Sequence, residues 1–217
     1  MTIRAKLYTA IVVAVAGLVL TGGAGVWGMN QLGDRFDAAR KADDARALAL
    51  QLKYGVTDFN GWQTAYGYDD GKSRAIFLRS VAAFQATLAR ARVQLRSRPE
   101  QRLLEEISDA FNDFMRLDDR AFAALRAGRT GEVKRIFLGP ELAIFERGAA
   151  AAQRLAELER ANASAQEHKF ERARTDALRR LLLAALVAAV LVGILLATAV
   201  DLARRAEQTL EESRPEP

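Results

Sequence analysis

Residues 181–200 read LLLAALVAAVLVGILLATAV and contain no charged side chain. About 20 consecutive apolar residues are enough for one helix to cross the hydrocarbon core of a bilayer. Two arginines precede this run, and Asp201, Arg204 and Arg205 follow it. The stretch therefore predicts a membrane-spanning helix, around which the rest of the chain is arranged.

A second uncharged run lies near the N-terminus, between Lys6 and Asp34. Two interpretations stay open, a second span or a cleavable secretory signal, because basic residues precede the apolar stretch. The run is longer than a typical signal core, which favours a span. Arg4 and Lys6 place the N-terminus in the cytoplasm, so we expect a multi-pass protein of the inner or plasma membrane. The predicted order is cytoplasmic segment, span, extracytoplasmic domain, span and cytoplasmic tail: residues 1–6, 7–28, 29–180, 181–200 and 201–217.

Both predicted spans carry small side chains at a spacing of four residues. Rows of this kind let two helix backbones approach closely where lipid provides no hydrophobic driving force. We therefore expect them to form packing faces within the bilayer. The rows are Gly17, Thr21 and Gly25 in the first span, and Ala185, Ala189, Gly193 and Ala197 in the second.

The extracytoplasmic domain is predicted to be helical throughout. Pro99 and Pro140 each fall where a helix is expected to begin, since proline fits the first turn. Apolar residues in the second and third predicted helices recur at alternating spacings of four and three, the pattern of helices that pack at shallow angles. The fold class is therefore all-α, an antiparallel four-helix bundle continuous with two transmembrane helices. Its helices are expected at about 29–67, 72–97, 99–127 and 140–180, with a short one at 130–138.

Residues 58–70 read DFNGWQTAYGYDD and lie at the end of the first bundle helix, far from the membrane. Phe59, Trp62 and Tyr66 share one helical face. That face caps the distal core, or it lines a small-molecule pocket whose anionic ligand is held by arginines of the next helix. The candidate ligand-binding residues are Asn60, Trp62, Gln63, Tyr66, Asp69, Arg74 and Arg79.

Several classes of chemistry are disfavoured. The chain has no cysteine, and its single histidine, His168, cannot form a histidine-based metal site. Gly71-Lys72-Ser73 resembles the end of a phosphate-binding loop but lacks the glycine five positions earlier. The net charge of +5 is spread over interspersed acidic and basic residues, which indicates a solvated surface rather than a nucleic-acid partner. We therefore predict a protein that is not an enzyme, with no catalytic residues, metal or cofactor.

Residues 121–158, AFAALRAGRTGEVKRIFLGPELAIFERGAAAAQRLAEL, resemble the connection between the third and fourth helices of sensor bundles in methyl-accepting chemotaxis proteins. Residues 60–66, NGWQTAY, resemble a segment of the same receptors. The resemblance implies a chemoreceptor-type input module, a homodimer in the lipid bilayer. Its bundle binds a small molecule or a ligand-loaded binding protein, and its second span signals to cytoplasmic partners.

The chain departs from that family after residue 200, where DLARRAEQTLEESRPEP replaces the expected HAMP linker and signalling hairpin. It is therefore either a truncated receptor or an input module that acts through partner chains. Two alternatives stay open: the input region of a sensor histidine kinase, and a membrane-anchored structural or interaction protein that senses no ligand. The sequence names no ligand.

Overall fold

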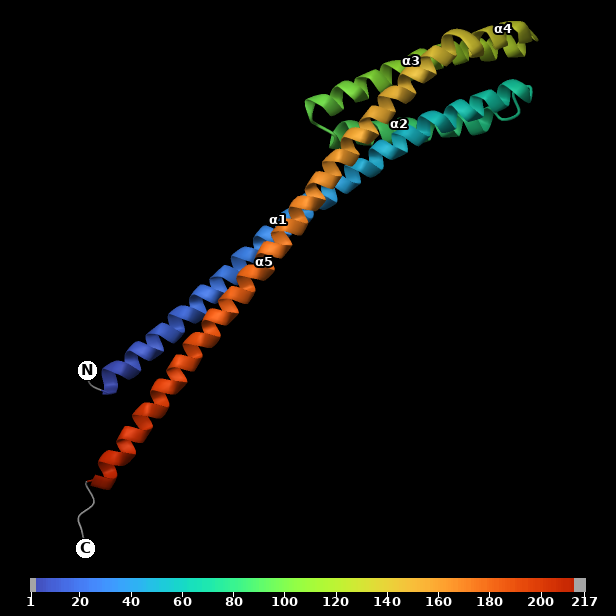
Figure 1. The fold of residues 1–217 in the computed structure, drawn as a ribbon. Coiled ribbons are helices and arrows are strands. Elements are labelled where there is room, and N and C mark those ends of the chain that lie inside the picture. Colours follow the sequence, from blue (N-terminus) through green and yellow to red (C-terminus); the bar gives the residue numbers. More distant parts are fainter. Residues whose placement is uncertain (1–2, 213–217) are drawn as a thin grey trace. The chain divides into compact units, whose positions relative to one another are not determined.

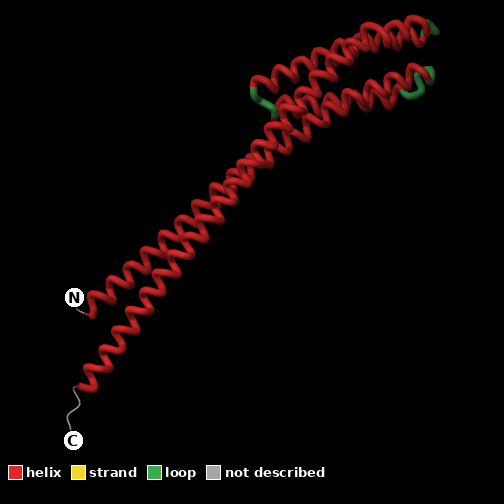
Figure 2. Tube along the Cα trace, viewed as in Figure 1, coloured by secondary structure: helices red, strands yellow, loops and turns green. Residues whose placement is uncertain are grey.

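The structure is a computed structural model that describes residues 3–212, without the side chains of residues 3–7, 9, 10, 13, 18, 20, 24, 202 and 205–212. Every element in this range is a helix and none is a strand (Figure 2), which confirms the predicted all-α class. The elements are α1 Ile3–Tyr68, α2 Arg74–Gln94, α3 Arg98–Arg126, α4 Thr130–Ile136, the π-helical segment η1 Phe137–Glu141, and α5 Leu142–Glu212.

The chain divides into two compact units. Unit 1 comprises Met1–Asp37 and His168–Pro217, and unit 2 comprises Ala38–Glu167. Residues 29–37 and 168–180, assigned to the extracytoplasmic domain from the sequence, thus belong to unit 1 by their contacts. Each unit is described by itself.

Unit 1 is a pair of helices, the first part of α1 and the last part of α5, which lie side by side (Figure 1). A Cβ added to Gly17 would lie 3.5 Å from Cδ1 of Leu191, so this glycine faces α5. The Thr21 hydroxyl donates to the carbonyl oxygen of Gly17 at 2.7 Å. The half-buried positions on the two facing sides include Ala14, Gly17, Thr21, Gly25, Gly28 and Leu32 of α1, and Ala177, Ala184, Ala188, Leu191 and Leu195 of α5.

The small-residue row predicted for the second span lies elsewhere on α5. All four of its members are exposed, whereas the half-buried positions alternate spacings of four and three. Four residues exceed one helical turn by about 40°, so a strict four-residue row rotates away from a straight contact face. A contact of this row with another chain stays a prediction. Its members are Ala185, Ala189, Gly193 and Ala197.

Within the described residues, one helix is long and apolar enough to cross a membrane, judged by length and composition alone. The helical stretch that contains it runs from α4 through η1 into α5, Thr130–Asp201, and its most apolar window has a mean hydropathy of 2.9 with no residue buried. The predicted span at 181–200 lies within it. The predicted span at 7–28 lies in α1 but includes side chains outside the described part of the chain, so it stays a prediction.

Unit 2 encloses an apolar core to which α1, α2, α3 and α5 all contribute. The ring of Phe59 lies at its centre, with its centroid 5.1 Å from that of Phe84, 5.7 Å from Phe111 and 4.9 Å from Phe114. These are tilted, edge-type contacts of the kind aromatic rings prefer. The seam predicted in the second helix is confirmed, because all its members are buried: Phe77, Val81, Phe84, Leu88, Ala91 and Leu95.

The helix ends of unit 2 follow local chemistry. Ser97 caps α3, because its side chain accepts from the Glu100 backbone N–H while Glu100 accepts from the Ser97 N–H. Leu95 is extended, so α2 ends at Gln94, before the predicted 97. Between α1 and α2 the backbone has a φ of 89° at Gly71, which favours glycine.

The predicted start of the last bundle helix at Pro140 is confirmed, because two helices meet at a kink here. Pro140 lies inside η1, and the preceding Gly139 has non-helical φ and ψ of −115° and −108°. Proline has no N–H to donate and restricts the residue before it, which explains why the helix is interrupted here. The kink at Gly139 therefore separates the short helix from the last bundle helix, as the sequence predicts.

Candidate functional site

Five polar side chains meet in the interior of unit 2, and we call them the charged cluster. Gln63 and Tyr66 come from α1, Arg74 from the first residue of α2, Asp118 from α3 and Glu141 from the last residue of η1. Four of them are almost completely buried, with Asp118 and Tyr66 at 0 % exposure. A buried charge is costly unless it is paired, so the partners of each of these side chains decide its protonation state.

Asp118 is the centre of the charged cluster. Nη1 of Arg74 donates to its two carboxylate oxygens at 2.7 and 2.5 Å, and Nε2 of Gln63 donates to Oδ1 at 3.1 Å. The Tyr66 hydroxyl also donates to Oδ1. Burial, followed by the Asp118 charge, raises the pKa of Tyr66 well above its usual value, so this hydroxyl remains a donor.

Aromatic rings surround the Arg74 guanidinium. Its central carbon lies 4.8 Å from the ring centroid of Tyr66, 4.6 Å from that of Phe77 and 4.5 Å from that of Phe122. Such cation–π contacts strengthen when the cation is desolvated, and this side chain is only 14 % exposed. Arg74 is thus held in place by Asp118 on one side and by rings around it, rather than by solvent.

Glu141 is the member of the charged cluster that has a buried oxygen atom without a hydrogen-bond partner. It is 2 % exposed; its Oε1 accepts from Gln63, but its Oε2 has no hydrogen-bond partner within the described chain. Burial raises its pKa to about 7, with a further contribution from the Asp118 charge and an opposing one from the Gln63 hydrogen bond. Arg74 and Asp118 already balance one another, so ionised Glu141 would add an uncompensated negative charge.

A third buried carboxyl group lies on α5. Glu159 is 2 % exposed, and its Oε1 accepts from the Asn162 amide at 3.2 Å. Burial, and then the charge of Glu100, raises its pKa to about 7. Glu100 lies in the first turn of α3, and its negative charge disfavours loss of the Glu159 proton.

The structure gathers three of the predicted ligand-binding residues, Gln63, Tyr66 and Arg74, into the charged cluster. The other four lie apart from it. Asp69 accepts from the Ser73 backbone N–H and hydroxyl at 3.2 and 2.5 Å, which lowers the pKa of Asp69 and closes the α1–α2 turn. Half-buried Asn60 and Trp62, and exposed Arg79, complete the set.

Sequence reasoning did not identify Asp118 and Glu141 as site residues, although a signal was present. The buried positions Phe111, Phe114 and Asp118 continue one alternation of four and three. Extending that register, instead of following only apolar residues, places a carboxylate in the core. Glu141 is likewise a buried carboxyl group, directly before α5.

The charged cluster is suited to reversible protonation and conformational change rather than to covalent chemistry. It contains no nucleophile beside a base, and its tyrosine has a raised pKa. Across the described residues no three His, Asp or Glu side chains come together in a way that could hold a metal ion. Glu141, whose pKa is raised to about 7, lies two residues from the kink at Gly139.

Comparison with known families, with curated proteins and with solved structures finds no match for this chain. Over residues 3–212, the fold and site define an all-α chain with a helix that could cross a membrane and a buried charged cluster. Its function is inferred from geometry and sequence.

Proposed function

We propose that the chain is the membrane-anchored input module of a sensory receptor. In this proposal residues 29–180 form an extracytoplasmic antiparallel four-helix bundle, and residues 7–28 and 181–200 cross the membrane. A stimulus changes the state of the charged cluster, and the second span passes that change inward. The chain is a signalling component and not an enzyme.

One observation carries the proposal: Glu141 immediately precedes α5, the same helix that contains the apolar residues 181–200. A change at the charged cluster therefore acts directly at the start of the candidate spanning helix. Exposed apolar side chains along that helix, such as Leu182 at 71 %, support its placement in lipid. Coupling free energies between two sites are typically about 1–3 kcal/mol. A change in protonation of one buried carboxyl group, at about 1.4 kcal/mol per pKa unit, is of the same size.

The test uses the full chain in lipid nanodiscs with a spin label at Ala203→Cys, a unique thiol because the chain has no cysteine. We expect the label mobility to change as the sample is titrated through neutrality, with a midpoint near the Glu141 pKa of about 7. Glu141→Gln should remove the change. Glu146→Gln is the matched control, because Glu146 is an exposed glutamate in the first turns of α5, five residues after Glu141.

Inserting three glycines after Arg179 should also remove the response, because a flexible segment cannot transmit a helix displacement. A label that responds identically in wild type, Glu141→Gln and the glycine insertion would refute the proposal. The enclosed geometry of the charged cluster favours one second candidate, a membrane-anchored scaffold without a sensory role. That candidate predicts no response of the label in any variant.

A further inference from the structure

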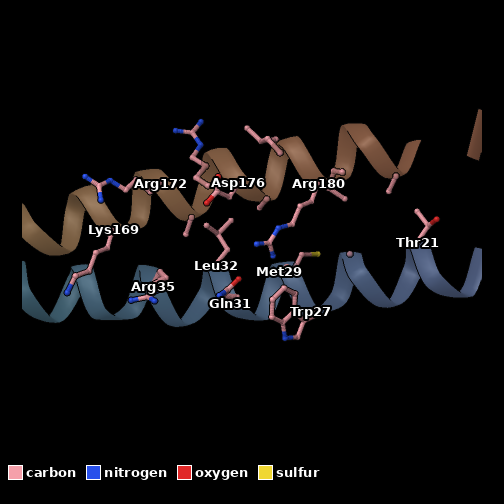
Figure 3. A pocket seen from close by; sticks show the side chains of 18 residues that line it. Thr21, Trp27, Met29, Gln31, Leu32, Arg35, Lys169, Arg172, Asp176 and Arg180 are labelled. Carbon is pink, nitrogen blue, oxygen red and sulfur yellow. The ribbon is translucent and has the colours of Figure 1, made fainter. Parts of the chain in front are cut away.

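Unit 1 contains a groove of about 830 Å³ between α1 and α5 (Figure 3). Its volume lies within the usual range for sites that bind small molecules. One end is lined by small and apolar residues, including Thr21, Gly25, Leu181 and Ala184, and the other end by charged ones. The groove therefore offers an apolar end and a charged end to a single bound molecule.

The charged end is strongly cationic. Five basic side chains line the groove against one carboxylate, that of Asp176. Arg174 also lies 3.7 Å from Glu171 on its own helix, which offsets part of this charge. Lys169 and Arg180 extend from α5 toward α1 (Figure 3). The basic set is Arg35, Lys169, Arg172, Arg174 and Arg180.

The groove lies at the boundary between the charged part of α5 and its uncharged, apolar part. Arg180 is the last charged residue before the uncharged run that starts at Leu181. Its guanidinium carbon lies 5.4 Å from the ring centroid of Trp27 on α1. Tryptophan is enriched at the boundary between hydrocarbon and water, and arginine binds phosphate through paired hydrogen bonds.

The basic residues of the groove lie on an unusual side of the membrane in the proposed topology. Basic residues normally gather on the cytoplasmic side, but the proposed topology places Arg179 and Arg180 on the opposite side. A local anionic partner offsets that cost. A molecule with a phosphate and an acyl chain also matches both the charged end and the apolar end of the groove. A soluble anion matches only the charged end.

We propose that this groove binds the headgroup of an anionic phospholipid, with Arg180 and Lys169 at the phosphate and the acyl chains along the apolar end. The inference rests on the proposed membrane placement. Each basic residue near an anionic surface contributes about 1 kcal/mol, so losing one should weaken the preference roughly fivefold.

The experiment uses the full chain with Trp62→Phe, which leaves Trp27 as the only tryptophan. The protein is reconstituted in phosphatidylcholine vesicles containing brominated phosphatidylglycerol or, separately, brominated phosphatidylcholine. We expect the anionic brominated lipid to quench Trp27 more strongly. Arg180→Gln and Lys169→Gln should each reduce that preference roughly fivefold, whereas Arg160→Gln, an exposed arginine of unit 2, should leave it unchanged.

Equal quenching by the two lipids overturns the inference while leaving the membrane placement intact. Loss of the preference in excess inorganic phosphate also overturns it, because the site would then bind a free anion. Absence of quenching by either lipid refutes the membrane placement itself, and with it the proposed function. Retention of the preference in phosphate, with loss in Arg180→Gln and Lys169→Gln, supports a lipid site.

Discussion

Replacing Glu141 with glutamine tests the electrostatics of the charged cluster. Burial raises the pKa of this carboxyl from its ordinary 4.5 to about 7. The folded state therefore holds the proton more tightly than the unfolded state does. The free energy of unfolding should fall as pH rises between these two values and stay level above the higher one.

The size of the effect follows from the pKa. Each pKa unit corresponds to about 1.4 kcal/mol, so ionising Glu141 costs the folded state about 3 kcal/mol. Glutamine has the same shape and cannot ionise. Glu141→Gln should match wild type in acid and melt roughly 10 °C higher in alkaline conditions, at about 3 °C per kcal/mol for a domain of this size.

The assay is thermal unfolding of the full chain in detergent, followed by Trp62 fluorescence in a Trp27→Phe background. Trp62 packs against the core of unit 2 and so reports on this unit. Glu159, whose pKa is also raised to about 7, contributes a second pH-dependent term that Glu159→Gln should remove. If Glu141→Gln retains the full pH dependence of wild type, Glu141 is ionised in the folded protein and the reasoning is refuted.

Three further substitutions test the packing of unit 2 by unfolding in denaturant. Asp118→Asn leaves the Arg74 guanidinium without its buried partner and should cost about 3–5 kcal/mol; a loss below 1 kcal/mol would indicate that Arg74 is solvated. Gly67→Ala places a Cβ 2.5 Å from Cε2 of Phe137, so about 1–3 kcal/mol should be lost unless that ring moves freely. Ser97→Ala removes a helix cap and should cost about 1 kcal/mol, whereas no loss would argue against the capping box.

Much of the fold could be predicted because apolar periodicity is a local property of the sequence. The break near Gly71, the start of α3 near Pro99 and the buried seam of α2 all follow from spacing and turn chemistry. The start of the last bundle helix near Pro140 was also predicted, because proline restricts the preceding residue and interrupts a helix.

The site was predicted less completely, because it forms between helices that are distant in sequence. Gln63 and Tyr66 were found through their aromatic neighbours, but Asp118 lies 52 residues beyond Tyr66, to which it is hydrogen-bonded. Arg74 pairs with that carboxylate, which the sequence did not indicate, and its contact with a ligand stays a prediction. A polar residue in an apolar seam shows that a partner is needed but does not say which residue supplies it.

The most direct measurement is the side of the membrane on which unit 2 lies. Ala82 and Ala203 are both exposed alanines, on α2 and near the end of α5, and each can be replaced by a unique cysteine. With a thiol reagent that cannot cross the membrane, we predict that Ala82→Cys is labelled in intact spheroplasts and Ala203→Cys only after lysis. Labelling of Ala203→Cys with Ala82→Cys protected, or recovery of the chain in the soluble fraction, would contradict an exported bundle anchored by its apolar helices.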